Sequence, residues 1–260
     1  MSKQTAQKKQ KIVRNSSIFA VATLCCVVFA YLTFIHHNNA SAEPYPIQGF
    51  DVSHHQGNID WKKISPKDYQ FVYLKATEGG DYQDDQFQKY WLGARERGLH
   101  VGAYHFFRLC REGLIQAENF IQTVPNKSDA LPPVIDLEYD SNCINAFNKQ
   151  QLLQHIQIMH DRLYQHYGKQ PIFYTSKTFY NIVLMGEFKS TPIWIREYKA
   201  QPDLKDGRPW LFWQRSNQGT IQGIDKMVDL NVFYGDQTEW EKFLQHNQIP
   251  QQPQPKSVEN

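Results

Sequence analysis

The stretch PPVIDLE, Pro132–Glu138, ends a short apolar run with two carboxyl groups. Its apolar core and the two prolines that precede it are typical of a buried β-strand. Side chains two residues apart in a strand point to the same face and lie about 6.5 Å apart along the chain. Asp136 and Glu138 should therefore leave the strand together and enter one pocket.

Two carboxyl groups at that distance repel each other when both are charged, so the pKa of one of them should rise. A protonated carboxyl beside a charged one is the pair that glycoside hydrolysis uses. Acids at strand ends are also common as solvated or ion-paired surface groups, and the pattern Asp136-x-Glu138 is by itself a weak signal. The rest of the chain favours the catalytic interpretation.

Seven other short runs have the same β-rich character as Pro133–Leu137 and predict further buried strands. They are Ile47–Val52, Phe71–Ala76, His100–Phe106, Ile172–Thr175, Ile193–Ile195, Leu211–Gln214 and Met227–Leu230. Apolar residues at helical spacing predict helices between or after them, at Gln86–Arg97, Gly113–Ile121, Lys149–Tyr167 and Glu239–Leu244. The connections after strands five to seven are short, so some helices must be missing or reduced. The pattern predicts the α/β class: a single irregular (β/α) TIM-like barrel with eight strands and a reduced number of helices.

The charge of the chain is unevenly distributed. The 260 residues carry a formal net charge of +2, but residues 1–42 hold five bases and no acid. The remainder has 23 bases against 26 acids, a formal charge of −3. A weakly acidic body without a basic stripe argues against nucleic acid as a partner.

The N-terminal segment has the features of an export signal. A basic stretch ends at Arg14, an apolar run spans residues 18–35, and Ala40-Ser41-Ala42 fits a signal-peptidase site. We expect residues 1–42 to be a signal peptide or a retained membrane anchor, because 18 apolar residues are at the border between the two. The barrel, residues 43–244, should then be exported to the periplasm or outside the cell, either free or tethered to the inner membrane. The Gln/Pro-rich tail, residues 245–260, should be disordered.

Export changes the interpretation of the cysteines. Cys25 and Cys26 belong to the apolar run, which leaves Cys110 and Cys143 in the body. In an oxidising compartment we expect these two to form a disulfide, since each follows the end of a neighbouring predicted strand by a few residues. The alternative is two separate buried thiols. Neither the cysteines nor the ten histidines have the spacing of a zinc site, and we expect no metal.

Further acids and aromatic residues should surround the same barrel mouth, because the chemistry of such barrels lies at the carboxyl ends of the strands. Asp51 and Asp229 end the first and last predicted strands, which are neighbours in a closed barrel, and Glu78 follows the second. Aromatic residues on the other strands are Tyr104, Tyr174, Trp194 and Trp213. Each one could be ordinary barrel core, but together with carboxylates they favour a saccharide groove.

Several motifs then support a specific family. The segment GFDVSHHQGNIDW, Gly49–Trp61, resembles the opening of the glycoside hydrolase family 25 lysozymes, the Chalaropsis-type N-acetylmuramidases. The resemblance continues in family order over nearly the whole body, from Ile47 to Leu244. Its further motifs are YLKATEG at 73–79, GAYHF at 102–106, Asp136-x-Glu138, IWI at 193–195 with Tyr198, WQ at 213–214 and VDLN at 228–231.

The resemblance implies a function and a set of roles. It implies cleavage of the β-1,4 bond between N-acetylmuramic acid and N-acetylglucosamine in peptidoglycan, without metal or cofactor. We expect the protein to be a monomer. The resemblance makes Glu138 the general acid, with Asp136 and Asp51 as its acidic partners at the scissile bond. The residues that it assigns to substrate binding are Asp229, Glu78, Tyr104, Tyr174, Trp194 and Trp213.

This chain also departs from the family pattern. Arg196-Glu197 follows Trp194-Ile195 where small residues are commoner, and residues 108–112 carry Cys110 in a rim loop. These departures bear on substrate choice. Two other functions stay open: a cell-wall-binding barrel without hydrolysis, and a chitinase-like glycosidase of another barrel family. The chitinase signature D-x-x-D-x-D-x-E is incomplete here, because Leu131 to Val134 precede Asp136.

Overall fold

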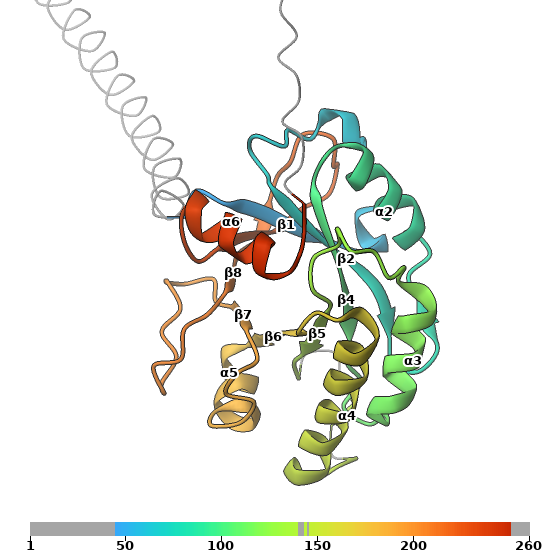
Figure 1. Ribbon diagram of the computed structural model, residues 1–260, viewed down its shortest axis with the longest axis vertical. Coiled ribbons are helices and arrows are strands. Elements are labelled where there is room, and N and C mark those ends of the chain that lie inside the picture. Colours follow the sequence, from blue (N-terminus) through green and yellow to red (C-terminus); the bar gives the residue numbers. More distant parts are fainter. Residues whose placement is uncertain (1–44, 140–142, 145, 251–260) are drawn as a thin grey trace, which may run out of the picture. The chain divides into compact units, whose positions relative to one another are not determined.

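The computed structural model describes residues 45–139, 143–144 and 146–250 (Figure 1). The expected signal peptide or anchor, residues 1–42, and the last ten residues of the tail lie outside this part of the chain. Among the described residues, no helix is both long and apolar enough to cross a membrane.

Eight strands close into one barrel, as the sequence predicts. They are β1 (Gln48–Val52), β2 (Phe71–Glu78), β4 (His100–Phe106), β5 (Val134–Leu137), β6 (Ile172–Ser176), β7 (Ile193–Arg196), β8 (Phe212–Gly219) and β9 (Val228–Phe233). Their order around the barrel is β1-β9-β8-β7-β6-β5-β4-β2, and β1 also pairs with β2, which closes the sheet. The two-residue strand β3 (Tyr82–Gln83) pairs only with the end of β2.

The last strand runs against its neighbours. β9 is antiparallel to both β8 and β1, whereas the other barrel pairs are parallel. Its bounds also differ from the predicted Met227–Leu230, so Asp229 lies near the start of the strand and not at its carboxyl end. Because the strand is reversed, its start meets the carboxyl ends of the others, and Asp229 still reaches the same mouth.

Helices cover only part of the barrel (Figure 1). The α-helices are α2 (Phe87–Glu96), α3 (Gly113–Thr123), α4 (Lys149–Tyr167), α5 (Lys177–Phe179) and α6 (Gln237–His246), with short turns η1 (His54–Gln56), η2 (Trp61–Lys63) and η3 (Tyr180–Leu184). Residues 197–211 and 220–227, which connect the last three strands, hold no helix. The expectation of a reduced set of helices is confirmed.

The longest helix illustrates how local sequence sets an element's ends. Asn148 precedes α4, and its side chain accepts a hydrogen bond from the Gln151 backbone N–H at 2.9 Å. Gly168 ends the helix in the left-handed conformation, φ 66°, which glycine adopts without steric cost. These signals explain why the predicted and observed bounds of this helix coincide.

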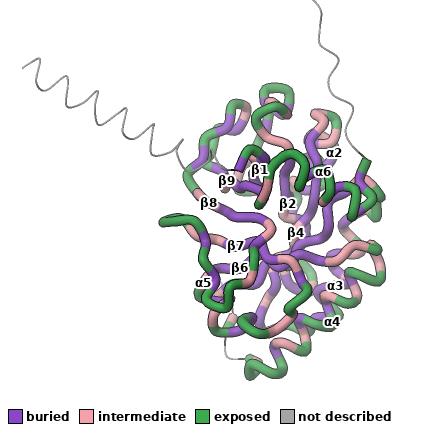
Figure 2. Tube along the Cα trace, turned by 60° about the vertical axis from the view of Figure 1, so that its left-hand side comes forward, coloured by how far each residue is buried: buried purple, intermediate pink, exposed green. Residues whose placement is uncertain are grey.

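Alternate side chains of each strand fill the barrel or face the helices. The interior cluster includes Phe71 and Tyr73 of β2, and the Tyr73 ring lies 5.0 Å from that of Trp194 across the barrel. Glycine makes room for these rings: a Cβ on Gly49 would lie 2.4 Å from the Phe71 ring, and one on Gly102 would lie 2.2 Å from the Tyr73 ring. Figure 2 shows the strands buried for most of their length, with exposed positions on loops and outer helix surfaces.

Helix α6 packs against the end of the barrel away from the carboxyl termini of the parallel strands. Its Trp240 ring lies 5.6 Å from that of Phe71 and 5.1 Å from that of Phe233. The ordered chain continues beyond residue 244, where the sequence places the start of the tail. Helix α6 runs to His246, and Ile249 is 4% exposed in the interior cluster. Buried apolar area explains this difference, since Ile249 gives the segment a packing partner that its polar composition does not indicate.

Candidate active site

A cavity of about 250 Å³ opens at the carboxyl ends of the parallel strands. Four carboxylic acids line it, Asp51, Asp136, Glu138 and Asp229, and four further barrel strands, β4, β6, β7 and β8, with the loop after β7, supply polar and aromatic walls. The remaining lining residues are Tyr104, Phe106, Tyr174, Trp194, Arg196, Tyr198, Gln214 and Asn217. The structure thus brings together the four acids that the sequence singled out at this mouth.

A larger hollow of about 1110 Å³ lies at the opposite end, near the start of β6 and the end of α6. Its lining includes Lys127, Lys169 and His160 but no aspartate or glutamate. It therefore lacks the carboxyl pair that acid-base hydrolysis of a glycoside requires. The smaller cavity is the candidate active site.

Strand β5 delivers the first pair of acids. Asp136 lies opposite Tyr174 of β6 in parallel register and is 6% exposed, and Glu138 follows the strand two residues later and is 8% exposed. Burial, and next the charge of Glu138, raise the pKa of Asp136 well above its usual range. Asp136 Oδ1 has no hydrogen-bond partner among the described residues. Asp136 is thus expected to hold a proton at neutral pH.

The second pair of acids comes from the antiparallel strands. Asp51 of β1 lies directly opposite Asp229 of β9. Burial and then the charge of Asp229 raise the pKa of Asp51 well above its usual range, whereas hydrogen bonds from two amides oppose this rise. Burial also raises the pKa of Asp229, to about 6. Burial and like charge therefore oppose simultaneous ionisation of both carboxyl groups in each pair.

Two amide side chains hold the second pair in place. Gln214 Nε2 donates to Asp51 Oδ2 at 3.0 Å and to Asp229 Oδ2 at 3.2 Å, and Asn231 Nδ2 donates to Asp51 Oδ2 at 2.8 Å. The Gln214 oxygen accepts from the Tyr174 hydroxyl at 2.9 Å, which sets the direction of the amide. Trp194 Nε1 donates to Asn231 Oδ1 at 2.9 Å.

These amides were not assigned roles from the sequence, although both belong to motifs quoted above. The position of Asn231 two residues after Asp229 is the signal that places both on the inner face of one strand. For Gln214 the sequence holds no such signal, because it places the neighbouring Trp213 at the mouth, and neighbours in a strand face opposite ways. Tyr198 was also unassigned; its hydroxyl donates to Gln214 Oε1 at 2.8 Å.

The structure separates the six expected substrate-binding residues into two groups. Asp229, Tyr104, Tyr174 and Trp194 line the cavity. Trp213 does not, because it packs on the outer side of β8 against Tyr45 and Trp210 and donates to the Glu197 carbonyl at 2.6 Å. The strand alternation that brings Gln214 into the cavity turns Trp213 away from it.

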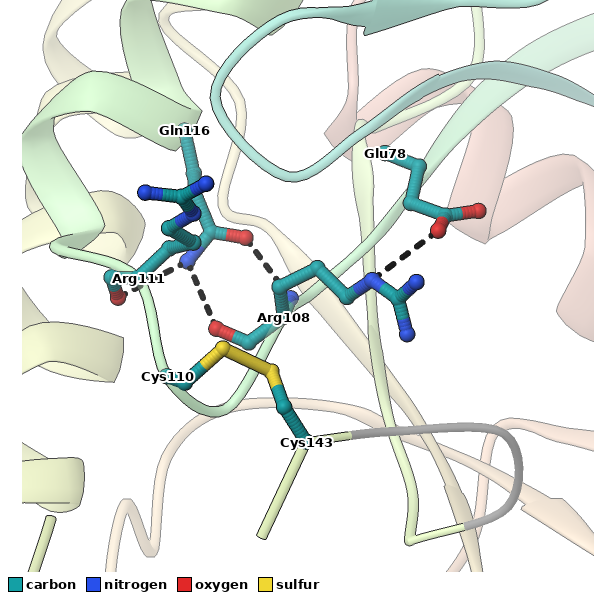
Figure 3. Close-up of a disulfide and its surroundings, with 6 residues drawn as sticks. All are labelled: Glu78, Arg108, Cys110, Arg111, Gln116 and Cys143. Atoms are coloured by element: carbon teal, nitrogen blue, oxygen red, sulfur yellow. Dashed lines mark hydrogen bonds and ion pairs between the residues drawn. A yellow bond between two sulfur atoms is a disulfide. The ribbon is translucent and has the colours of Figure 1, made fainter. Parts of the chain in front are cut away.

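Glu78 lies outside the cavity in an ion-pair network. Its carboxylate lies 2.7 Å from Lys75 Nζ. It also lies 3.0 Å from Arg108 Nε, as Figure 3 shows. Both cations also lie over the ring of Phe106, at 5.2 and 5.7 Å from its centroid. Since Phe106 lines the cavity, Glu78 supports the wall from behind and does not face the space itself.

The rim loop after β4 is anchored by a disulfide and by one glutamine (Figure 3). Cys110 and Cys143 are bonded, with their Cα atoms 5.7 Å apart. Gln116 of α3 accepts from the Arg108 backbone N–H at 2.7 Å and donates to the carbonyls of Arg108 and Arg111, both at 3.1 Å. The covalent link joins the loops that follow β4 and β5.

One basic side chain lines the cavity. Arg196, the last residue of β7, places Nη1 at 3.0 Å from Glu138 Oε2. The sequence singled out this position only as a departure from the family pattern. Within the described ranges, no three His, Cys, Asp or Glu side chains are grouped so that they could hold a metal ion.

The arrangement can perform acid-base chemistry on a sugar. Each pair of carboxyl groups combines a proton donor with a charged partner, which are the two functions that glycosidic bond cleavage needs. The Tyr104, Tyr174 and Trp194 side chains supply apolar ring faces and hydrogen-bonding edges, which suit a pyranose ring.

Comparison with known proteins agrees with this chemistry. The family model "Glycosyl hydrolases family 25" matches residues 50–224. The uncharacterized protein YegX of Escherichia coli O6:H1 is 36% identical over 205 residues, which cover 77% of this chain and 74% of that protein. Lysozyme M1 of Streptomyces globisporus is 32% identical over 205 residues, covering 75% of this chain and 70% of its own.

A solved structure is similar over the same region. The family 25 glycosyl hydrolase from Bacillus anthracis has a TM-score of 0.72 and 40% sequence identity, and the match covers 76% of this chain and 93% of that one. The family match, the barrel and the carboxyl pairs lead to one conclusion. The chain belongs to glycosyl hydrolases family 25.

Proposed function

We propose that this glycoside hydrolase is a lysozyme, an N-acetylmuramidase that cleaves the β-1,4 bond between N-acetylmuramic acid and N-acetylglucosamine in peptidoglycan. The observation that carries the proposal is the convergence of four carboxylic acids, three of them buried, on one aromatic-walled cavity. The similarity to Lysozyme M1 supports the choice of substrate.

In this proposal Glu138 is the general acid, the role that the resemblance to family 25 implies for it, and it lines the cavity two residues after Asp136. It gives its proton to the glycosidic oxygen as the bond to the sugar breaks. Asp136 and Asp51 stabilise the positive charge that develops on the sugar ring, since a carboxylate is stabilising beside an oxocarbenium-like centre. Asp229 shares a proton with Asp51 and completes the pocket.

Digestion of purified peptidoglycan, followed by mass spectrometry of the new reducing ends, tests the function. New reducing muramic acid is expected, and its rate should scale with the amount of protein. A preparation of the Glu138→Gln variant controls for contaminating hydrolases. Reducing glucosamine would indicate another glycosidase specificity, and binding without any release would indicate a wall-binding protein; either result contradicts the proposal.

We further propose that the barrel works outside the cytoplasm, where peptidoglycan lies. The basic and apolar segments of residues 1–42 support this location, as does a disulfide, which forms in oxidising compartments. Cell fractionation with N-terminal mass analysis of the recovered protein is the test. A chain that starts at Glu43 means cleavage, and a membrane-bound chain that retains residues 18–35 means an anchor. Recovery of the full-length chain from the soluble cytoplasm would contradict export.

A further inference from the structure

Arg196 is the feature of the cavity that the proposed function does not use. It is the only basic side chain among the described residues that line this space, where it faces four acids. Its ion-pair partner Glu138 has a side chain that is 11% exposed, whereas the Arg196 side chain is 24% exposed. The Arg196 side chain is therefore more accessible than the acid with which it pairs.

The pairing has a cost for the chemistry assigned to Glu138. A guanidinium 3.0 Å away stabilises the charged carboxylate, but a general acid has to carry a proton when the glycosidic bond breaks. Asp136, the other member of the pair, is more suited to hold the proton in the unliganded enzyme. It is only 6% exposed, one of its oxygens has no partner among the described residues, and burial raises its pKa.

The other charged and titratable groups around the pair leave this assignment unchanged. Across the barrel, Lys75 of β2 favours the charged form of Asp136 and Asp51 of β1 opposes it, but burial remains the largest cause and raises its pKa. The further groups that face the pair are Tyr104 of β4, Tyr174 of β6, Tyr198 after β7 and Asp229 of β9. None of these tyrosines carries a charge near neutral pH, and Asp229 is held by Gln214.

We propose that Arg196 is a positioning residue that keeps Glu138 ionised until a carboxylate on the glycan draws the guanidinium away. The inference rests on the proposed lysozyme function. It identifies the binding event that moves the proton onto the general acid. In the unliganded enzyme the proton of the pair resides on Asp136. When the guanidinium moves to the substrate anion, the proton passes to Glu138, and Asp136 becomes the carboxylate that faces the developing positive charge.

The number of protons is conserved in this sequence. The pair holds one proton before and after the guanidinium moves, and Glu138 then transfers it to the glycosidic oxygen as the carbon–oxygen bond breaks. Substrates with a carboxylate beside the scissile bond should therefore be preferred over neutral glycans. In peptidoglycan such a carboxylate is either the free lactyl group of muramic acid or a carboxylate of the attached peptide.

Kinetics with three substrates test the proposal. They are peptide-free glycan strands with free lactyl groups, peptide-bearing strands, and a neutral chitooligosaccharide. We expect the native enzyme to favour at least one anionic substrate, and Arg196→Gln to lower that preference by about tenfold in kcat/KM, the scale of one charge-assisted hydrogen bond. The anionic substrate whose kcat/KM advantage over the neutral substrate is lost in Arg196→Gln carries the carboxylate that the guanidinium binds. Arg196→Lys, which keeps the charge, should restore part of it.

A pH profile separates this role from simple packing. Removing the guanidinium lets Glu138 keep its proton to higher pH, so the alkaline limb of kcat/KM on the neutral substrate should move upward by about one pH unit in Arg196→Gln. Arg162→Gln removes a surface ion pair with Glu118 between α3 and α4 and is the matched control, with no change expected. An unchanged limb together with unchanged substrate preference would overturn the proposal.

A measurement without turnover completes the test. The ¹³C resonance of the Glu138 carboxyl, assigned by comparison with Glu138→Gln, should be that of a carboxylate near neutral pH in the free enzyme and shift toward the protonated value in Arg196→Gln. Identical titration curves in the two proteins would refute the role of Arg196. If the native enzyme released no reducing muramic acid from any substrate, the proposed function would fail, whereas an active enzyme indifferent to Arg196 would contradict this inference alone.

Discussion

At the scale of single residues, two effects let four acids occupy one largely buried cavity. Raised pKa values favour the protonated form of some carboxyl groups, and amide side chains donate hydrogen bonds to others. Asp51 receives hydrogen bonds from Gln214 and Asn231, whereas Asp136 has an oxygen without a partner among the described residues. Burial raises the pKa of both. An amide that donates to a carboxylate lowers the cost of its charge, so the two pairs are tuned by different neighbours.

Removing the proton donor should stop catalysis and leave the fold intact. Glu138→Gln keeps the size of the side chain but cannot donate a proton to the leaving oxygen, so we expect kcat to fall by at least about 10²-fold. Glu96→Gln, an exposed position on α2, is the control and should keep native turnover. A Glu138→Gln protein with near-native release of reducing muramic acid would show that another group is the acid.

Asp136→Asn should shift the pH dependence of catalysis. The charge of one member of the pair raises the proton affinity of the other, and the neutral asparagine removes that effect. The alkaline limb of the kcat profile should therefore move to lower pH. A limb at the native position would mean that the two acids are not coupled in the enzyme–substrate complex.

Asp229→Asn should stabilise the protein at neutral pH. In the folded state the pKa of Asp229 is about 6, above the usual 3.8. The stability that protonated Asp229 contributes is therefore fully present below about pH 4 and is lost as the pH rises through 6. The variant avoids this loss, and we expect up to about 3 kcal/mol more unfolding free energy at pH 7.5. Urea unfolding at pH 7.5 and pH 4 checks this, with exposed Asp225→Asn as control; a gain that persists at pH 4 would contradict the titration.

At the scale of elements, the loops that follow β4 and β5 work as one unit. The Cys110–Cys143 bond joins them, and Gln116 fixes the turn at Arg108–Arg111 from within α3. The second loop also follows Glu138 directly. Stiffening this rim should help hold the acid in place, because the residue lies between the end of β5 and the covalent link.

Removing the disulfide should lower stability more than activity. The bond has a sequence separation of 33 residues, for which the chain-entropy relation gives about 3–4 kcal/mol. The double variant Cys110→Ser/Cys143→Ser should lose an unfolding free energy of that order in urea. Non-reducing digestion with mass spectrometry should yield the two cysteine peptides as one cross-linked species. Recovery of both as free-thiol peptides from unreduced protein would contradict the bond.

At the scale of the whole molecule, the barrel closes through β1, which pairs with β2 in parallel and with β9 in antiparallel register. This closure brings Asp51 and Asp229 face to face although 178 positions separate them in numbering. It also requires the Phe71 ring to pass over Gly49. Packing at the closing seam and assembly of the second acid pair are therefore linked.

Gly49→Ala should weaken the closed barrel. A Cβ there would lie 2.4 Å from the Phe71 ring, so the strand or the ring must shift, and overpacking of this kind costs about 1–3 kcal/mol. Asp51 lies two residues after Gly49 on the same strand, so a shift of β1 should also lower activity. Gln83→Ala on the exposed strand β3 should change the unfolding free energy by less than about 0.5 kcal/mol. Equal unfolding free energies of the two variants would contradict the tight packing of the Phe71 ring over Gly49.

The sequence by itself determined the barrel class, the number of strands, the bounds of α4 and the pair on β5. All of these depend on local signals: alternation of apolar side chains, helix caps, and two acids at i and i+2. It also indicated Asp51 and Asp229, since the first and last strands of a closed barrel are neighbours.

Only the tertiary structure decided which way β9 runs and which side chains enter the cavity. Strand direction depends on pairing with β1 and β8, which no local pattern encodes. The inward turn of Gln214 and the outward turn of Trp213 depend on strand register, and a one-residue change would exchange them. The contact of Arg196 with Glu138 likewise joins the ends of two strands that are not adjacent in the barrel, so only the closed structure reveals it.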